Sequence, residues 1–143
     1  MQMNQITPAY TVSPQITPED VADIAAAGFK TILCNRPDAE NPPHLYQSEI
    51  KAAADAAGLT FLVNPFPSPM MTMEHVDAQA ELLKQAQAPV FAYCASGTRC
   101  SVVWSMVMAG EMETDAILDA IRGAGYNLDG LRPQIDALAQ SRS

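Results

Sequence analysis

An unbroken apolar run, APVFAYC at residues 88–94, constrains the fold of this chain more than any other feature. A strand with apolar side chains on both faces is typical of the centre of a parallel sheet, where helices cover both sides. Two other β-rich runs, FKTILCN at 29–35 and LTFLVN at 59–64, alternate with segments of helical periodicity. This alternation predicts an α/β protein whose central, mostly parallel sheet has four to five strands and is flanked by helices.

Helix boundaries follow from capping residues and from glycines. The predicted helices cover residues 17–28, 45–57, 72–87, 100–110, 114–124 and 133–140. The first has Thr17 as its N-cap and Pro18 at the first helical position, a typical start. The helix at 100–110 is apolar nearly all round, so it is expected to be central and buried. Residues 9–17 are expected to add an edge strand, whose length Pro14 limits.

The composition excludes several classes of function. The formal net charge of −8, with only eight Lys and Arg residues, argues against a surface for nucleic acid or anionic membrane. A bound anion must therefore be held locally, by backbone N–H groups and one or two arginines. The first ten residues contain no signal peptide and no run could span a membrane, so a cytoplasmic location is expected. Without internal repeats, residues 1–143 are expected to form one domain.

Three cysteines in a chain of this length do not make a disulfide framework, which is consistent with a reducing compartment. The spacing of Cys34, Cys94 and Cys100 contains no C-x-x-C pair, and the two histidines, His44 and His75, lie far apart in the sequence. Neither a structural zinc ion nor another cofactor is expected from this pattern.

The segment YCASGTRCS at residues 93–101 combines the features of an anion-binding catalytic loop. A strand ends at Cys94, a turn contains Gly97, and a helix is expected to begin near Ser101. Successive backbone N–H groups in such a turn, with a helix N-terminus behind them, form a nest for an anion. Arg99 adds a planar fork for two oxygens. Because this positive field lowers the pKa of a thiol, Cys94 is predicted to be a thiolate nucleophile.

The loop therefore supplies the predicted site residues. Cys94 and Arg99 are the predicted catalytic pair. The predicted substrate-binding residues are Ala95, Ser96, Gly97, Thr98, Cys100 and Ser101. In the alternative interpretation Cys94 is a buried strand cysteine and Arg99 is a surface residue. The order of strand, cysteine, glycine, arginine and helix favours the catalytic loop.

This segment, together with ITPEDVADIAAAGFKTILCNRPDAE and AAADAAGL, resembles the beta-lactamase hydrolase-like family from about Gln15 to about Gly110. The family consists of small bacterial domains with the protein tyrosine phosphatase fold, described both as phosphatase-like and as sulfur transferases. The resemblance implies a central parallel sheet flanked by helices, as in tyrosine and dual-specificity phosphatases. It also implies that Cys94 is the nucleophile and that the loop from Ala95 to Arg99 is the oxyanion cradle.

Two positions depart from the pattern of that family. Its loop usually carries an arginine directly after the nucleophile, where this chain has Ala95. It usually carries a serine after the second arginine, where this chain has Cys100. The first difference is expected to weaken the attraction for an anionic substrate. The second removes a hydroxyl that could stabilise the thiolate, a role in which Ser101 could partly replace it.

Loop length separates two candidate activities. Tyrosine and dual-specificity phosphatases have five residues between cysteine and arginine, whereas this chain has four and in this resembles the rhodanese sulfurtransferases. Phosphatases also use a general acid, which the loop NPFPSPMMTM at 64–73 does not offer before Glu74. The sequence thus favours a sulfurtransferase in which Cys94 takes a sulfane sulfur from thiosulfate or a low-molecular-weight persulfide. A thiol or cyanide would then accept that sulfur. The alternatives are a cysteine-dependent phosphatase and a non-catalytic anion-binding module.

Another thiol could react with an oxidised or persulfidated Cys94. Cys34 ends a second strand and is expected on the same side of a parallel sheet, so Cys34 and Cys100 are both candidate resolving thiols. The alternative for Cys34 is a position in the core. Arg36 and Asp38 are expected to tie down their own loop. The expected partners are a small anionic sulfur donor, a thiol acceptor and, from the resemblance, an enzyme of sulfide or persulfide oxidation.

Overall fold

A computed structural model describes all of residues 1–143 and contains one five-stranded sheet with the order β1-β2-β5-β3-β4. The strands are β1 (Asn4–Thr7), β2 (Tyr10–Ser13), β3 (Thr31–Cys34), β4 (Thr60–Val63) and β5 (Val90–Tyr93). Every neighbouring pair is parallel except β1 and β2, which are antiparallel. The predicted α/β class and the mostly parallel sheet are therefore confirmed.

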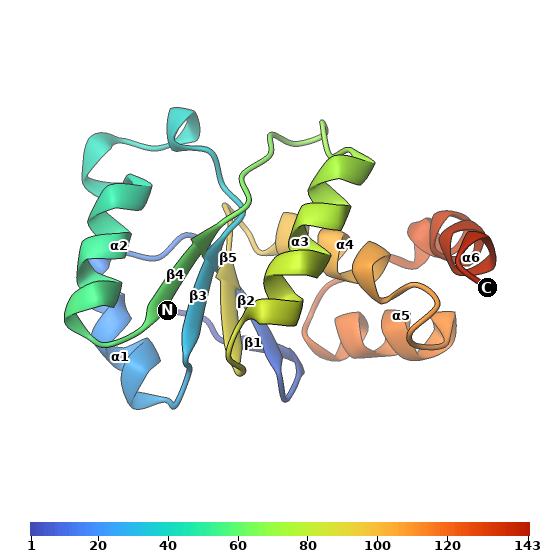
Figure 1. Cartoon of the computed structure of the whole chain (residues 1–143), viewed down its shortest axis with the longest axis horizontal. Helices are drawn as coiled ribbons and strands as arrows, with labels where there is room; N and C mark the ends of the chain where they lie inside the picture. The colour runs from blue at the N-terminus through green and yellow to red at the C-terminus, as the bar shows by residue number, and fades with distance from the viewer.

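Helices cover both faces of this sheet (Figure 1). The α-helices are α1 (Val21–Ala26), α2 (Gln47–Ala56), α3 (Met73–Gln85), α4 (Thr98–Met108), α5 (Thr114–Gly123) and α6 (Arg132–Ser141). Short 3-10 helices are η1 (Pro18–Asp20), η2 (Asp38–Glu40), η3 (Pro43–Leu45) and η4 (Asp129–Leu131). In Figure 1, α1 and α2 lie against one face and α3 and α4 against the other, with α5 and α6 on the α4 side. None of the helices has the length and apolar character that crossing a lipid bilayer requires.

Strand β5 contributes to two separate hydrophobic cores. Val90, Ala92 and Cys94 pack into the core under α3 to α6, whereas Phe91 and Tyr93 pack into the core under α1 and α2. Successive residues of a strand point to opposite faces, and helices cover both faces of this sheet. All five side chains are therefore buried. The central position of β5 thus explains why its sequence lacks polar residues.

Two predictions are wrong, one about the position of a strand in the sheet and one about the start of a helix. The strand predicted at residues 9–17 is not an edge: β2 lies between β1 and β5, and the short antiparallel strand β1 forms the edge instead. The buried helix begins at Thr98 rather than near Ser101, since Gly97 takes a left-handed conformation (φ 93°) as its N-cap. Arg99 and Cys100 therefore belong to the first turn of α4 and not to a longer loop.

A buried polar network joins the carboxyl ends of the strands to two helices. Asn35 and Asn64 directly follow β3 and β4, and each amide donates to the Gln79 Oε1 atom over 2.9 Å. Gln79 donates in turn to the Tyr10 hydroxyl (3.3 Å), which donates to the backbone carbonyl of Cys100 (2.9 Å). Gln79 itself is completely buried in α3. One glutamine therefore fixes two strand ends relative to the first turn of α4.

We expect Gln79→Ala to lower the free energy of unfolding by about 3 kcal/mol, because the substitution removes the buried acceptor that the amides of Asn35 and Asn64 share and the donor that faces Tyr10. Chemical denaturation monitored by Trp104 fluorescence measures the change. The matched control is Gln85→Ala, since Gln85 lies exposed on the same helix and bonds only Glu81. Equal losses in the two variants would contradict the role assigned to the network.

Candidate active site

The connection from β5 to α4 is held by a tyrosine from a distant part of the chain. The Tyr126 hydroxyl donates to the Ser96 carbonyl (2.9 Å) and accepts from the Asn4 side chain (3.0 Å). A Cβ atom at Gly97 would collide with that hydroxyl. Glycine is therefore required there twice, for its left-handed backbone and for the close approach of Tyr126.

Cys94 lies fully buried at the base of this connection, where several hydrogen-bond donors converge on its sulfur. The Gly97 N–H donates to Cys94 Sγ over 3.1 Å. The Cys100 thiol, followed by the backbone N–H groups of Cys100, Ser96 and Gly97, lowers the pKa of Cys94 to about 5 against the opposing effect of burial. Since α4 also directs its positive N-terminus at this sulfur, Cys94 is a thiolate at neutral pH.

The cysteine that replaces the family's serine takes part in this stabilisation. Burial raises the pKa of Cys100 well above its usual value, so that the thiol remains a proton donor beside Cys94. The hydroxyl of Ser101 instead donates to the Gly97 carbonyl (2.9 Å) and does not bond the sulfur. The expected loss of thiolate stabilisation is therefore wrong, and Ser101 is not the replacement.

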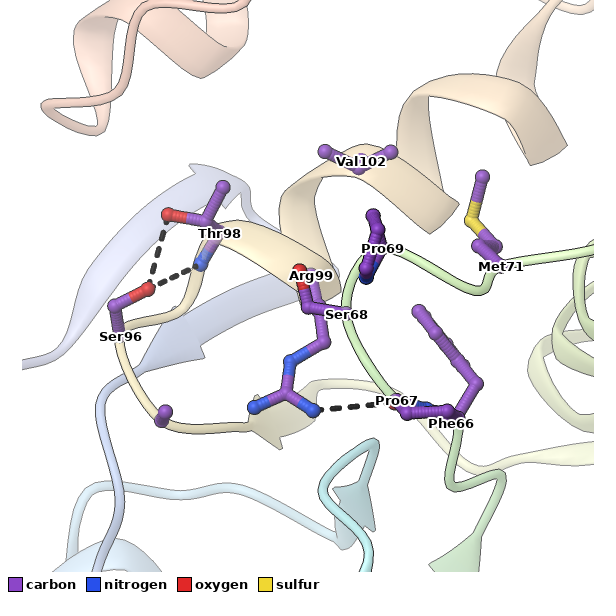
Figure 2. A pocket seen from close by; sticks show the side chains of 10 residues that line it. Phe66, Pro67, Ser68, Pro69, Met71, Ser96, Thr98, Arg99 and Val102 are labelled. Atoms are coloured by element: carbon purple, nitrogen blue, oxygen red, sulfur yellow. Dashed lines mark hydrogen bonds between the residues drawn. The ribbon is translucent and has the colours of Figure 1, made fainter. Parts of the chain in front are cut away.

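Arg99 is oriented by an ion pair that the sequence analysis missed. Its Nη1 and Nη2 atoms donate to the two carboxylate oxygens of Glu40, over 2.8 and 2.7 Å, and Nη1 also donates to the Phe66 carbonyl (3.1 Å). The remaining donors, Nε–H and one hydrogen on Nη2, form the side edge of the guanidinium. Figure 2 shows that this edge is turned toward the loop that carries Ser96. Arg99 can thus donate to two oxygens of an anion while Glu40 holds it in place.

A cavity of about 400 Å³ opens over this loop. Its walls are Phe66, Pro67, Ser68, Pro69 and Met71 from the segment after β4, and Ala95, Ser96, Thr98, Arg99 and Val102 from the loop and α4 (Figure 2). Four of the eight predicted site residues thus line the cavity. Four others, Cys94, Gly97, Cys100 and Ser101, are buried beneath it. The structure brings all eight together around one sulfur atom.

Cys34 lies on the other face of the sheet. Its side chain belongs to the core under α1 and α2 together with Tyr93, whereas Cys94 and Cys100 belong to the opposite core. Its thiol donates to the Arg36 carbonyl (3.2 Å), and burial raises its pKa. A resolving thiol stays a prediction, and this placement favours Cys100 over Cys34 for the role.

The loop after β3 is tied down as predicted, although with a different partner. Arg36 pairs with Glu40 (3.2 Å) rather than with Asp38, which accepts from the backbone N–H of Gln47 at the start of α2. Glu40 was detectable as the acidic residue four positions after Arg36 in NRPDAE. Nothing in the sequence pointed to Tyr126 as a contact of the loop.

The segment after β4 and the start of α3 carry one histidine and three methionines. His75 forms a capping box with Thr72 and stacks on Phe66, with ring centroids 5.0 Å apart. Of the clustered methionines, Met71 lines the cavity, while Met70 and Met73 are exposed. No group of three or more His, Cys, Asp or Glu side chains is arranged to hold a metal ion.

Sequence comparison places this arrangement in a known family. The family model described as "Beta-lactamase hydrolase-like protein, phosphatase-like domain" matches residues 2–111. A beta-lactamase hydrolase-like protein of Agrobacterium fabrum (strain C58) is 30% identical over 130 residues, which are 90% of this chain and 30% of that protein. The chain thus spans about 30% of the length of the curated relatives that it matches.

Structure comparison gives a consistent result. A candidate phosphatase from Neisseria meningitidis Z2491 is 36% identical, with a TM-score of 0.84 over 96% of this chain and 99% of that one. The core catalytic domain of the PP-IP phosphatase SIW14 from S. cerevisiae has the same fold, with a TM-score of 0.69, 15% identity and coverage of 98% and 91%. The chain is therefore a phosphatase-like protein with the protein tyrosine phosphatase fold. These neighbours support the phosphatase alternative better than the sulfurtransferase that loop length favoured.

We expect alkylation of Cys94 by iodoacetamide to speed up as the pH rises through about 5 and to level off above it, because only the thiolate reacts. Peptide mass spectrometry at a series of pH values measures the midpoint. Cys100→Ala removes the largest stabilising hydrogen bond and should move the midpoint upward. Cys34→Ala is the matched control and should leave the midpoint in place. A wild-type midpoint near about 8.5, the value of an ordinary thiol, would contradict the geometry.

Proposed function

The chain belongs to the family of phosphatase-like domains of beta-lactamase hydrolase-like proteins, and from this premise we propose that it is a cysteine-dependent phosphatase. The observation that supports the proposal most directly is the convergence of donors on Cys94 at the base of the cavity. A thiolate with a depressed pKa is a nucleophile at neutral pH. The side edge of Arg99, held by Glu40, supplies the matching anion-binding group.

In the proposed reaction the Cys94 sulfur attacks the phosphorus atom of the substrate. A sulfur–phosphorus bond forms, the bond to the leaving oxygen breaks, and the electron pair departs with that oxygen. Arg99 and the N–H groups at the start of α4 hold the phosphoryl oxygens as charge develops on them. Water then attacks the phosphorus, the sulfur–phosphorus bond breaks, and phosphate and the Cys94 thiolate are released.

A sulfurtransferase is the second candidate, and the four-residue spacing between Cys94 and Arg99 supports it. In that reaction Cys94 attacks the sulfane sulfur of thiosulfate, the sulfur–sulfur bond breaks, and sulfite leaves with the electron pair. The persulfide then gives its outer sulfur to a thiol or cyanide acceptor. An enzyme of sulfide or persulfide oxidation would be the partner of this activity.

Intact-protein mass spectrometry separates the two candidates. The protein is incubated briefly with an aryl phosphate, or with thiosulfate, and quenched in acid. For the proposed phosphatase we expect the gain of one phosphoryl group from the aryl phosphate and continuing phosphate release. The sulfurtransferase would instead gain one sulfur atom from thiosulfate, which cyanide removes. Cys94→Ser is the control and should abolish both adducts.

The matched comparison uses a second cysteine and a binding measurement. Cys34→Ser should keep either adduct, since that thiol lies in the opposite core. A sulfur adduct without any phosphoryl adduct or phosphate release would overturn the phosphatase proposal. If wild type forms neither adduct but binds phosphate as tightly as Cys94→Ser does, the chain is a non-catalytic anion-binding module.

A further inference from the structure

The side chains around the cavity contain no group that gives up a proton readily near neutral pH. Those with exchangeable hydrogens are Ser68, Ser96, Thr98 and Arg99. The Ser96 hydroxyl donates to Thr98 (3.0 Å), and a serine or threonine hydroxyl is a very weak acid. None of these groups matches the acidity of a general acid, whose pKa lies near the working pH.

The nearest titratable groups are engaged in other contacts. Arg99 lowers the pKa of Glu40 through paired hydrogen bonds, so this carboxylate carries no proton to give. His75 does not line the cavity: its ring stacks on Phe66, and its Nδ1 accepts from the Thr72 backbone N–H (3.0 Å). Tyr126 donates its hydroxyl proton to the Ser96 carbonyl, and burial raises its pKa. A leaving oxygen in this cavity therefore departs without protonation by the protein.

The charge around the cavity suits a single anionic group. Arg99 is the only ionised side chain in its lining, and Glu40 neutralises it within the same contact. The Cys94 thiolate adds a negative charge beneath the floor. A polyanion such as a nucleoside triphosphate would meet no further cation here, whereas one phosphoryl group matches the two free donors of Arg99.

The opposite wall is apolar. Phe66, Pro67, Pro69 and Met71 form it, and Val102 continues it on α4. A volume of about 400 Å³ is at the lower end for a small-molecule site, and it has room for a ring-sized group beside a phosphoryl group. The segment after β4 thus offers hydrophobic contact to the part of the substrate that leaves.

Deepening the proposed phosphatase function on which it rests, we infer that the substrate class is a phosphate attached to an acidic oxygen on an apolar body: an aryl phosphate of an acidic phenol, or an acyl phosphate. Such leaving groups depart as phenolate or carboxylate with the electron pair and need no proton at that moment. Cys94 takes the phosphoryl group, and water later releases it as phosphate. Phosphotyrosine, whose phenol is a weak acid, is a poor substrate for this site.

The test is a series of substituted phenyl phosphates whose phenols have pKa values from about 5 to about 10, the latter matching tyrosine. We expect kcat/KM to fall by about a hundredfold or more across the series, since no proton transfer compensates for a worse leaving group. Benzoyl phosphate, corrected for spontaneous hydrolysis with Cys94→Ser, should react faster than every phenyl phosphate. Naphthyl phosphates should have a lower KM than phenyl phosphates of equal acidity, because of the apolar wall.

A gain-of-function variant makes the test sharper. Ser68 lines the cavity on the segment after β4, and Ser68→Asp adds the missing carboxyl group there. We expect this variant to raise kcat/KM for the least acidic phenol by about tenfold and to flatten the series. Ser68→Asn has the same size without an acid and should keep the wild-type slope.

The outcomes distinguish a failure of this inference from a failure of the proposed phosphatase function on which it rests. Cys94-dependent hydrolysis at equal rates across the wild-type series would overturn the inference and leave the phosphatase in place, because a flat series requires a proton donor. No Cys94-dependent hydrolysis of any member would overturn the proposed phosphatase and this inference together.

Discussion

The hydrogen bonds that converge on the Cys94 sulfur are the interaction on which the rest of the site depends. A buried thiolate is costly unless several donors face it. Here the donors are the Cys100 thiol and the backbone N–H groups of Ser96, Gly97 and Cys100, which face the sulfur because α4 begins directly after Gly97. The left-handed Gly97 and the Tyr126 contact follow from that requirement, because they set where the helix starts.

Two further sets of contacts bring the cavity wall to this charge. Arg99 reaches from α4 to Glu40 on one side and to the Phe66 carbonyl on the other, so a single guanidinium joins three segments. Below it, Gln79 joins the ends of β3 and β4 to the carbonyl of Cys100 through Tyr10. Hydrogen bonds thus fix the site at two places, the guanidinium of Arg99 and the buried amide of Gln79. Both sets of contacts hold the backbone of the segment after β4, which carries the apolar wall.

Local patterns predicted much of this structure, and long-range contacts account for what they missed. The runs around β3, β4 and β5 identified the sheet, because strands buried on both faces need continuous apolar sequence. The loop with Cys94, Gly97 and Arg99 was identifiable, since its residues are contiguous. β1 was missed because a four-residue polar strand has no such signal. The contacts of Glu40 and Tyr126 with the loop span 59 and 30 positions, a separation at which one sequence alone indicates no pairing.

The Tyr126 contact also bears on where the functional unit ends. The family model stops at residue 111, yet the side chain that steadies the nucleophile's loop comes from beyond that point. Farther on, Arg142 in the last turn of the chain donates to the carbonyls of Met106 and Ala109 at the end of α4. The chain beyond residue 111 therefore supports both ends of α4, through Tyr126 after α5 and Arg142 after α6. A fragment trimmed to the matched region would retain every reacting atom and lose the support that keeps those atoms in place.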